Sequence, residues 1–144
     1  MDPDIISTLI KAAQFSDILN KHSAALIKNN KIYAIAINDI VKTVEFINHS
    51  GRLNCRKITR HAEENVFFKT KIKNVKNLDI IVIRINSKLE LRNSKPCVHC
   101  LEKLKKYNIR KVYYSTQEGG LHSDYLSNIT KDHISSGQKL DCYR

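Results

Sequence analysis

Residues 78–85 place the strongest constraint on how this chain can fold. They read Leu-Asp-Ile-Ile-Val-Ile-Arg-Ile, a nearly unbroken run of apolar and β-branched residues. Such a run is typical of a strand that is covered on both faces, because a half-exposed strand alternates between apolar and polar residues. We therefore predict a central strand with helices on both sides of its sheet.

The first half of the chain supplies other elements of such a fold. Apolar residues recur at helical spacing from Ile6 onward, which predicts an amphipathic helix that runs to about Asn20. Two apolar runs, 23–27 and 32–37, surround Lys-Asn-Asn-Lys and predict a hairpin, since Asn tolerates the positive φ of a tight turn. Residues 39–59 have mixed polarity, and for them we predict a long irregular connection.

In the second half, predicted helices and strands alternate. A helix is expected from about Arg60 to Lys73, with acidic residues in its first turn and lysines in its last. A further helix is expected with Pro96 in its first position, followed by a strand at 111–115, whereas the segment from Gly119 shows little periodicity. This order predicts a three-layer α/β/α sandwich around a mixed sheet of about five strands.

The composition is that of one globular domain. The 144 residues are 42% hydrophobic and 27% charged, with only four Gly and two Pro, and this length fits a single core over residues 1–144. No stretch approaches the roughly 18 apolar residues of a spanning helix, and no basic segment leads into an apolar one at the N-terminus. We therefore expect a soluble cytoplasmic protein without a membrane partner.

The net charge of +11 and the pI near 9.6 indicate a phosphate-bearing or polyanionic partner. Arg52, Arg56 and Lys57 are candidates for binding a substrate phosphate, because they lie on the predicted connection just before His61. A solvated basic face is the competing interpretation. The abundance of Lys, Ile and Asn is also expected of an A- and T-rich coding sequence.

Two short motifs carry the chemistry, and each lies at the start of a predicted helix. One contains His61 and Glu63, and the other contains Cys97 and Cys100. One His and two Cys leave the fourth coordination position of zinc open, as in catalytic sites. Zinc lowers the pKa of bound water towards about 7, and Glu63 lies close enough along the helix to His61 to move the protons.

The combined spacing His-x-Glu and Pro-Cys-x-x-Cys resembles the cytidine and deoxycytidylate deaminase superfamily of zinc-dependent nucleobase deaminases. The resemblance covers roughly residues 20–115. It implies a cytidine deaminase-like fold, the zinc ligands named above, and Glu63 as the proton shuttle. It also implies that the backbone of Ala62 contacts the base and that Asn38 hydrogen-bonds the sugar or the base.

The resemblance implies a hydrolytic deaminase of cytidine, deoxycytidine, CMP or dCMP, which yields the uracil product and ammonia. One alternative is a deaminase of cytosine or adenine within RNA or single-stranded DNA, which the positive charge favours. Another is an inactive binding module stabilised by zinc. The superfamily commonly forms homo-oligomers, so the resemblance implies a homo-oligomer here as well.

The other cysteines and histidines receive no role. Cys55 and Cys142 are expected to be reduced thiols. His99 lies between the two Cys ligands but off their helical face, so we expect it to be exposed or at the rim of the site. The remaining histidines are expected to be ordinary surface residues: His22, His49, His122 and His133.

Overall fold

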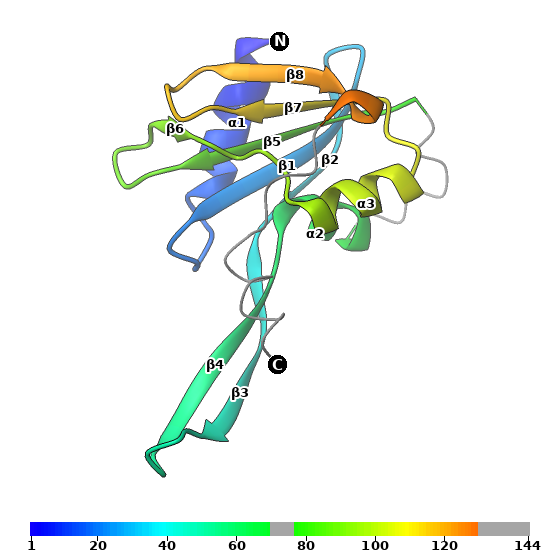
Figure 1. Cartoon of the computed structure of the whole chain (residues 1–144). Coiled ribbons are helices and arrows are strands. Elements are labelled where there is room, and N and C mark those ends of the chain that lie inside the picture. The colour runs from blue at the N-terminus through cyan, green and yellow to red at the C-terminus, as the bar shows by residue number, and fades with distance from the viewer. Residues whose placement is uncertain (70–76, 130–144) are drawn as a thin grey trace.

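A mixed β-sheet between helices forms the body of the protein (Figure 1). The structure is a computed structural model, and it describes residues 1–69 and 77–129. The helices are α1 (Pro3–Ala13), α2 (Ala62–Lys69) and α3 (Val98–Lys106), with a short 3-10 helix at Leu126–Asn128. The strands are β1 (Lys21–Lys28), β2 (Lys31–Ile37), β3 (Asp39–Ile47), β4 (Leu53–Arg60), β5 (Asp79–Ile85), β6 (Leu91–Arg92), β7 (Lys111–Ser115) and β8 (Leu121–Tyr125).

The central strand is β5, as the apolar run predicts. The sheet has the order β2-β1-β5-β7-β8, and the short strand β6 pairs with the end of β5. Strands β5 and β7 run parallel, whereas the other pairs of this sheet are antiparallel. The sheet is therefore mixed, as expected.

Apolar side chains from the two faces of the sheet build two core layers. On one face, α1 packs on β1 and β5 through a cluster that includes Leu9, Ala25, Ile81 and Ile83. On the other face, α2 and α3 pack through a second cluster that includes Ala24, Leu26, Ala62, Val66, Ile80, Val82, Leu101 and Leu104. The α/β/α sandwich is thus confirmed, with α2 and α3 side by side on one face.

The hairpin of β1 and β2 is confirmed, but the first helix is shorter than predicted. Asn29 and Asn30 form the turn with φ of +52° and +59°, the left-handed values that a two-residue hairpin needs. Helix α1 ends at Ala13 instead of near Asn20. The Ser16 hydroxyl donates to Asn38, which ties residues after α1 to the end of β2 and ends the helical path.

The prediction of an irregular connection at 39–59 is wrong. Strands β3 and β4 form an antiparallel ribbon that extends away from the main sheet (Figure 1). Its turn is stabilised by the Asn48 carboxamide, which accepts from the backbone N–H groups of Ser50 and Arg52, and by Gly51 at φ +76°. The mixed polarity of this segment fits a ribbon whose described side chains are mostly exposed, at positions 43, 45–47, 53–55 and 59.

Three predicted boundaries also differ from the structure. Helix α2 begins at Ala62, and its predicted end at Lys73 lies outside the described residues. Helix α3 begins at Val98, so Pro96 precedes the helix and does not occupy its first position. Within the segment from Gly119, residues Leu121–Tyr125 form β8, because pairing with β7 supplies order that local periodicity does not show. Among the helices described, none is long and apolar enough to cross a membrane.

Replacing Leu104 with Ala tests the packing of α3 on the sheet. Leu104 is fully buried, so we expect Leu104→Ala to lower the free energy of unfolding by about 2–5 kcal/mol through lost contacts and a cavity. Chemical denaturation of the metal-free protein measures this change. Leu19→Ala is the matched control, because Leu19 is 93% exposed and its removal should cost less than about 0.5 kcal/mol.

Candidate metal centre and active site

The candidate site lies where the N-termini of α2 and α3 meet. The carbonyl of His61 accepts from Asn65 N–H, and the carbonyl of Cys97 accepts from Leu101 N–H, so both residues cap their helices. Helix N-termini carry partial positive charge, which favours a thiolate. The local sequence thus places one predicted ligand at each helix start, and the packing of both helices on one sheet face brings the starts together.

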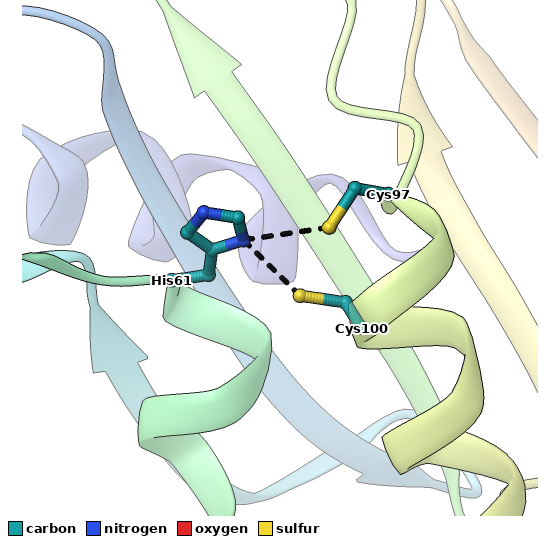
Figure 2. Close-up of side chains that lie close together, drawn as sticks. All are labelled: His61, Cys97 and Cys100. Atoms are coloured by element: carbon teal, nitrogen blue, oxygen red, sulfur yellow. Dashed lines mark hydrogen bonds between the residues drawn. The ribbon is translucent and has the colours of Figure 1, made fainter. Parts of the chain in front are cut away.

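The structure brings the three predicted ligands into one cluster (Figure 2). The Nδ1 atom of His61 lies 3.2 Å from Sγ of Cys100 and 3.7 Å from Sγ of Cys97. All three ligand atoms lie within 4.8 Å of one another, and both cysteines are buried. Cys97 is the N-cap of α3, and Cys100 lies in the first turn of this helix. Both cysteine side chains therefore point towards His61, which lies at the start of α2.

This geometry fits a tetrahedral zinc ion. Zinc binds thiolate at about 2.3 Å and imidazole at about 2.0–2.1 Å, which at tetrahedral angles separates sulfur from nitrogen by about 3.6 Å. The two distances from His61 Nδ1 fall on either side of this value. One nitrogen and two sulfur donors satisfy three positions, as in zinc sites that keep a position for water or substrate.

The three groups share protons in a defined way when no metal is bound. Hydrogen bonding from Cys100 lowers the pKa of Cys97 to about 3, so Cys97 is a thiolate. Hydrogen bonding to that thiolate raises the pKa of His61 to about 9. The hydrogen bond to Cys97, together with burial, raises the pKa of Cys100 well above the usual thiol range. The metal-free site therefore holds protons on His61 and Cys100 at neutral pH.

Glu63 is buried beside this cluster. It lies in the first turn of α2, and its carboxylate acts on Cys100 by charge and by a hydrogen bond. The same carboxylate acts electrostatically on His61 and on His22. Ala62, the first residue of α2, is also buried, and its N–H belongs to the first-turn donors that lack a partner within the helix.

Asn38 is buried at the end of β2, where it organises the loop before β1. Its Oδ1 accepts from the Ser16 hydroxyl at 2.7 Å and from the N–H of His22 at 3.0 Å. Its Nδ2 donates to the carbonyl of Asn20 at 2.7 Å. Nδ2 also lies 3.5 Å from Nδ1 of His22, so four contacts with the protein hold this carboxamide, and the contact with His22 is the longest of them. The predicted contact with substrate stays a prediction.

The expectation that His22 is an ordinary surface residue is wrong. Its ring is half-buried, its Nδ1 lies 3.0 Å from the carbonyl of Asn20, and it interacts with Glu63 and His61. Burial lowers its pKa, which favours the neutral ring. The sequence did contain a signal for this position. His22 lies two residues before Ala24, and alternate residues of a strand project from the same face of the sheet.

Further polar residues missed by the sequence analysis hold the two ligand-bearing helices. Asn65 of α2 is buried and donates to the carbonyl of Ile37 at 2.7 Å, which ties α2 to the end of β2. The Ser94 hydroxyl donates to the carbonyl of Val82 at 2.7 Å and accepts from Ser115 N–H at 2.8 Å. These bonds fix the segment that leads into Cys97. Glu64 and Lys103 form an ion pair between α2 and α3.

The predicted phosphate-binding cations lie on the ribbon. With about 3.3 Å per residue, the nine residue steps from Arg52 along β4 to His61 span roughly 30 Å. Within one chain, this distance places Arg52 away from the three predicted metal ligands, because the segment is an extended ribbon and not a loop folded over the site. Arg56 and Lys57 lie on β4, but their side chains are outside the described part.

The remaining cysteines and histidines lie apart from the cluster or outside the description. His99 is exposed on α3, as expected, and Cys55 is an exposed free thiol on β4. His49 is exposed at the turn of the ribbon. Cys142 and His133 lie outside the described residues.

Two solved structures share this fold. Cytidine deaminase from Burkholderia pseudomallei is similar with a TM-score of 0.61 and 16% identity, over 93% of this chain and 100% of that chain. The dCMP deaminase from the cyanophage S-TIM5, solved in complex with dCMP and dUMP, is similar with a TM-score of 0.50 and 20% identity, over 81% of this chain and 85% of that chain. No family model and no curated protein matches the sequence. The chain therefore has the cytidine deaminase-like fold that its motifs implied.

The protonation states of the three predicted ligands determine how zinc affinity should depend on pH. Zinc must displace the protons that the raised pKa values hold on His61 and Cys100, whereas Cys97 is already ionised. Affinity should therefore rise as pH increases towards about 9 and fall on acidification. With two protons released per ion, the change is about 100-fold per pH unit across the neutral range.

Competition with a chromophoric chelator at several pH values measures this slope. His99→Asn is the matched control, because His99 is exposed on the same helix turn and should leave the slope unchanged. An affinity that does not vary with pH would contradict the proton assignment.

Proposed function

We propose that the protein is a zinc-dependent hydrolase that converts a cytosine nucleoside or nucleotide to the uracil product and releases ammonia. The observation that carries this proposal is the buried carboxylate of Glu63 beside the cluster of His61, Cys97 and Cys100. The cytidine deaminase-like fold supports it. The described helices and sheet share one pair of core layers, which supports a single deaminase domain.

The residues divide the reaction between metal binding and proton transfer. His61, Cys97 and Cys100 would hold zinc, which supplies Lewis acidity that makes hydroxide available at neutral pH. Water adds to C4 of the base, and Glu63 takes its proton and delivers it to N3. Glu63 then carries the remaining proton of the added hydroxyl to the amino group on C4. The C4–N bond breaks, ammonia leaves, and the oxygen stays on C4 as the carbonyl of the uracil product.

Asn38 and Ala62 are the proposed contacts to the substrate. The Asn38 carboxamide can donate to the sugar or the base by exchanging its long 3.5 Å contact with His22 for one with the substrate, and the bonds from Ser16 and to Asn20 hold it in place. Ala62 is the first residue of α2, and Glu63 is the second. The start of α2 can therefore present both the N–H of Ala62 and the carboxylate of Glu63 to the base.

The position of Glu63 favours an enzyme over an inactive binding module. A carboxylate that is 5% exposed is costly to bury, and such groups are kept mainly where they are paired or used in chemistry. A zinc ion that only stabilises the fold is normally held by four protein ligands and needs no buried carboxylate next to them.

The net charge of +11 favours a second candidate substrate, a base within RNA or single-stranded DNA. Contacts between cations and a strand release counterions, so binding of a short single strand should weaken steeply as salt increases. Binding that is absent or indifferent to salt would exclude this candidate. Free nucleosides and nucleotides remain the proposed partners, and a homo-oligomer remains the proposed assembly.

Replacing Glu63 with Gln tests the proton transfer. We expect Glu63→Gln to lower the rate of ammonia release by about 10²- to 10⁴-fold, because an amide cannot accept and return the protons. The zinc content should stay at the wild-type level, since Glu63 is not among the three ligand residues. The measurement is a screen of the zinc form with cytidine, deoxycytidine, their monophosphates and short single strands.

Glu102→Gln is the matched control, because Glu102 is an exposed carboxylate on α3 and its loss should leave the rate unchanged. Full activity of Glu63→Gln on the substrate that the wild type deaminates would overturn the proposed mechanism.

A further inference from the structure

Three basic side chains form a row across adjacent strands on the face of the sheet that carries the metal cluster. His22 of β1 lies directly opposite Arg84 of β5, and Arg84 lies directly opposite Arg92 of β6. Directly opposed residues of antiparallel strands project from the same face, about 5 Å apart. His22, Arg84 and Arg92 are therefore called the basic row.

The alternation of core residues shows which face this is. On β5, Val82 packs in the cluster with α2 and α3, and Arg84 is two residues further on. On β6, Leu91 packs with the α1 cluster, so its neighbour Arg92 projects to the opposite face. The basic row thus lies on the side of α2 and α3, the helices that hold the metal ligands.

Hydrogen bonds connect this row to the proposed substrate contacts. Nη2 of Arg84 donates to Oδ1 of Asn20 at 2.9 Å, and the carbonyl of Asn20 accepts from Asn38 Nδ2 at 2.7 Å. His22 interacts electrostatically with both Arg84 and Glu63. The row therefore begins next to the proton shuttle and leads outward from it.

Within the described part of the chain, no ion pair compensates the positive charge of Arg84. It is half-buried, its partner Asn20 is neutral, and among residues 1–69 and 77–129 no carboxylate forms an ion pair with it. Partly buried guanidinium groups are normally paired with an anion, because desolvation of an unpaired charge is costly. Within the described residues, the one ion pair of Arg92 is a 3.5 Å pair with Glu90, whose side chain is 51% exposed. Nη1 of Arg92 donates to the neutral carbonyls of Leu91 and Gln117 at 3.3 and 3.2 Å. Both arginines can therefore accept a further anion.

We propose that Arg84 and Arg92 bind the phosphate of a cytosine nucleotide whose base lies beside Glu63. The inference rests on the proposed function and assigns its substrate class: a nucleotide, with its phosphate free or within a strand, and not a nucleoside. A planar guanidinium can donate two parallel hydrogen bonds to a phosphate, which gives orientation as well as charge neutralisation. The sugar bridges the base site and the basic row.

Binding of reaction products tests this assignment without any turnover. Calorimetry on the zinc-loaded protein compares UMP with uridine and dUMP with deoxyuridine. In the wild type, at least one monophosphate should bind more tightly than its nucleoside. Arg84→Gln should weaken the binding of that monophosphate about 10- to 100-fold and leave the nucleoside unchanged.

Three further variants keep the test decisive. Arg92→Gln should weaken the binding of the same monophosphate, and it replaces Arg84→Gln in the test if that variant does not fold. Arg84→Lys keeps the charge without the planar donor pair, so its loss should be smaller than that of Arg84→Gln. Lys88→Gln is the matched control, because Lys88 is an exposed cation in the turn after β5 and should change neither affinity.

The two phosphate sources differ in a competition experiment. A short single strand with one cytosine that displaces the monophosphate from the wild type, but binds Arg84→Gln weakly, assigns the phosphate to a polynucleotide. A strand that does not compete assigns it to a free nucleotide. The inference is overturned if wild-type affinity is the same with and without phosphate, or if Arg84→Gln weakens nucleoside and nucleotide equally.

The proposed function fails in a different way. In that case no cytosine compound releases ammonia, although monophosphate binding still depends on Arg84.

Discussion

The packing of two helix N-termini against one face of the sheet is the constraint on which the site depends. Val66 of α2 and Leu104 of α3 are buried on strands β1 and β5, and this places the capping residues His61 and Cys97 side by side. Because a helix turns about 100° per residue, a shift of either helix by one residue would direct its ligand away from the others. The apolar core thus sets the geometry of the cluster of His61, Cys97 and Cys100.

Buried polar groups complete this positioning. The carboxamide of Asn38 fixes the loop before β1, and the Ser94 hydroxyl fixes the segment before α3. Such groups need hydrogen-bond partners once they leave water, so each has a narrow set of allowed positions. Apolar packing brings the elements together, and these directional bonds determine where the connecting segments run. A site for chemistry needs both, because packing alone tolerates small displacements that proton transfer does not.

Local sequence patterns predicted the elements whose signal is local. The apolar run of β5 required cover on both faces, and the paired Asn residues required a tight turn between β1 and β2. The ligand motifs could be recognised because zinc coordination demands particular residue types at helical spacing. The same approach failed for β3, β4 and β8, whose order depends on pairing with another strand more than on their own periodicity.

The sequence by itself was enough to predict the cluster of His61, Cys97 and Cys100, the neighbouring carboxylate of Glu63 and the layered fold, since each is signalled by residue type and spacing along the chain. Only the tertiary structure decided which cations lie near them. It placed Arg52 at the far end of a ribbon and brought Arg84 opposite His22 on the site face. The physical reason is that cross-strand neighbours are set by strand order and register. Those depend on the packing of the whole sheet and leave no signal in the spacing of the residues concerned.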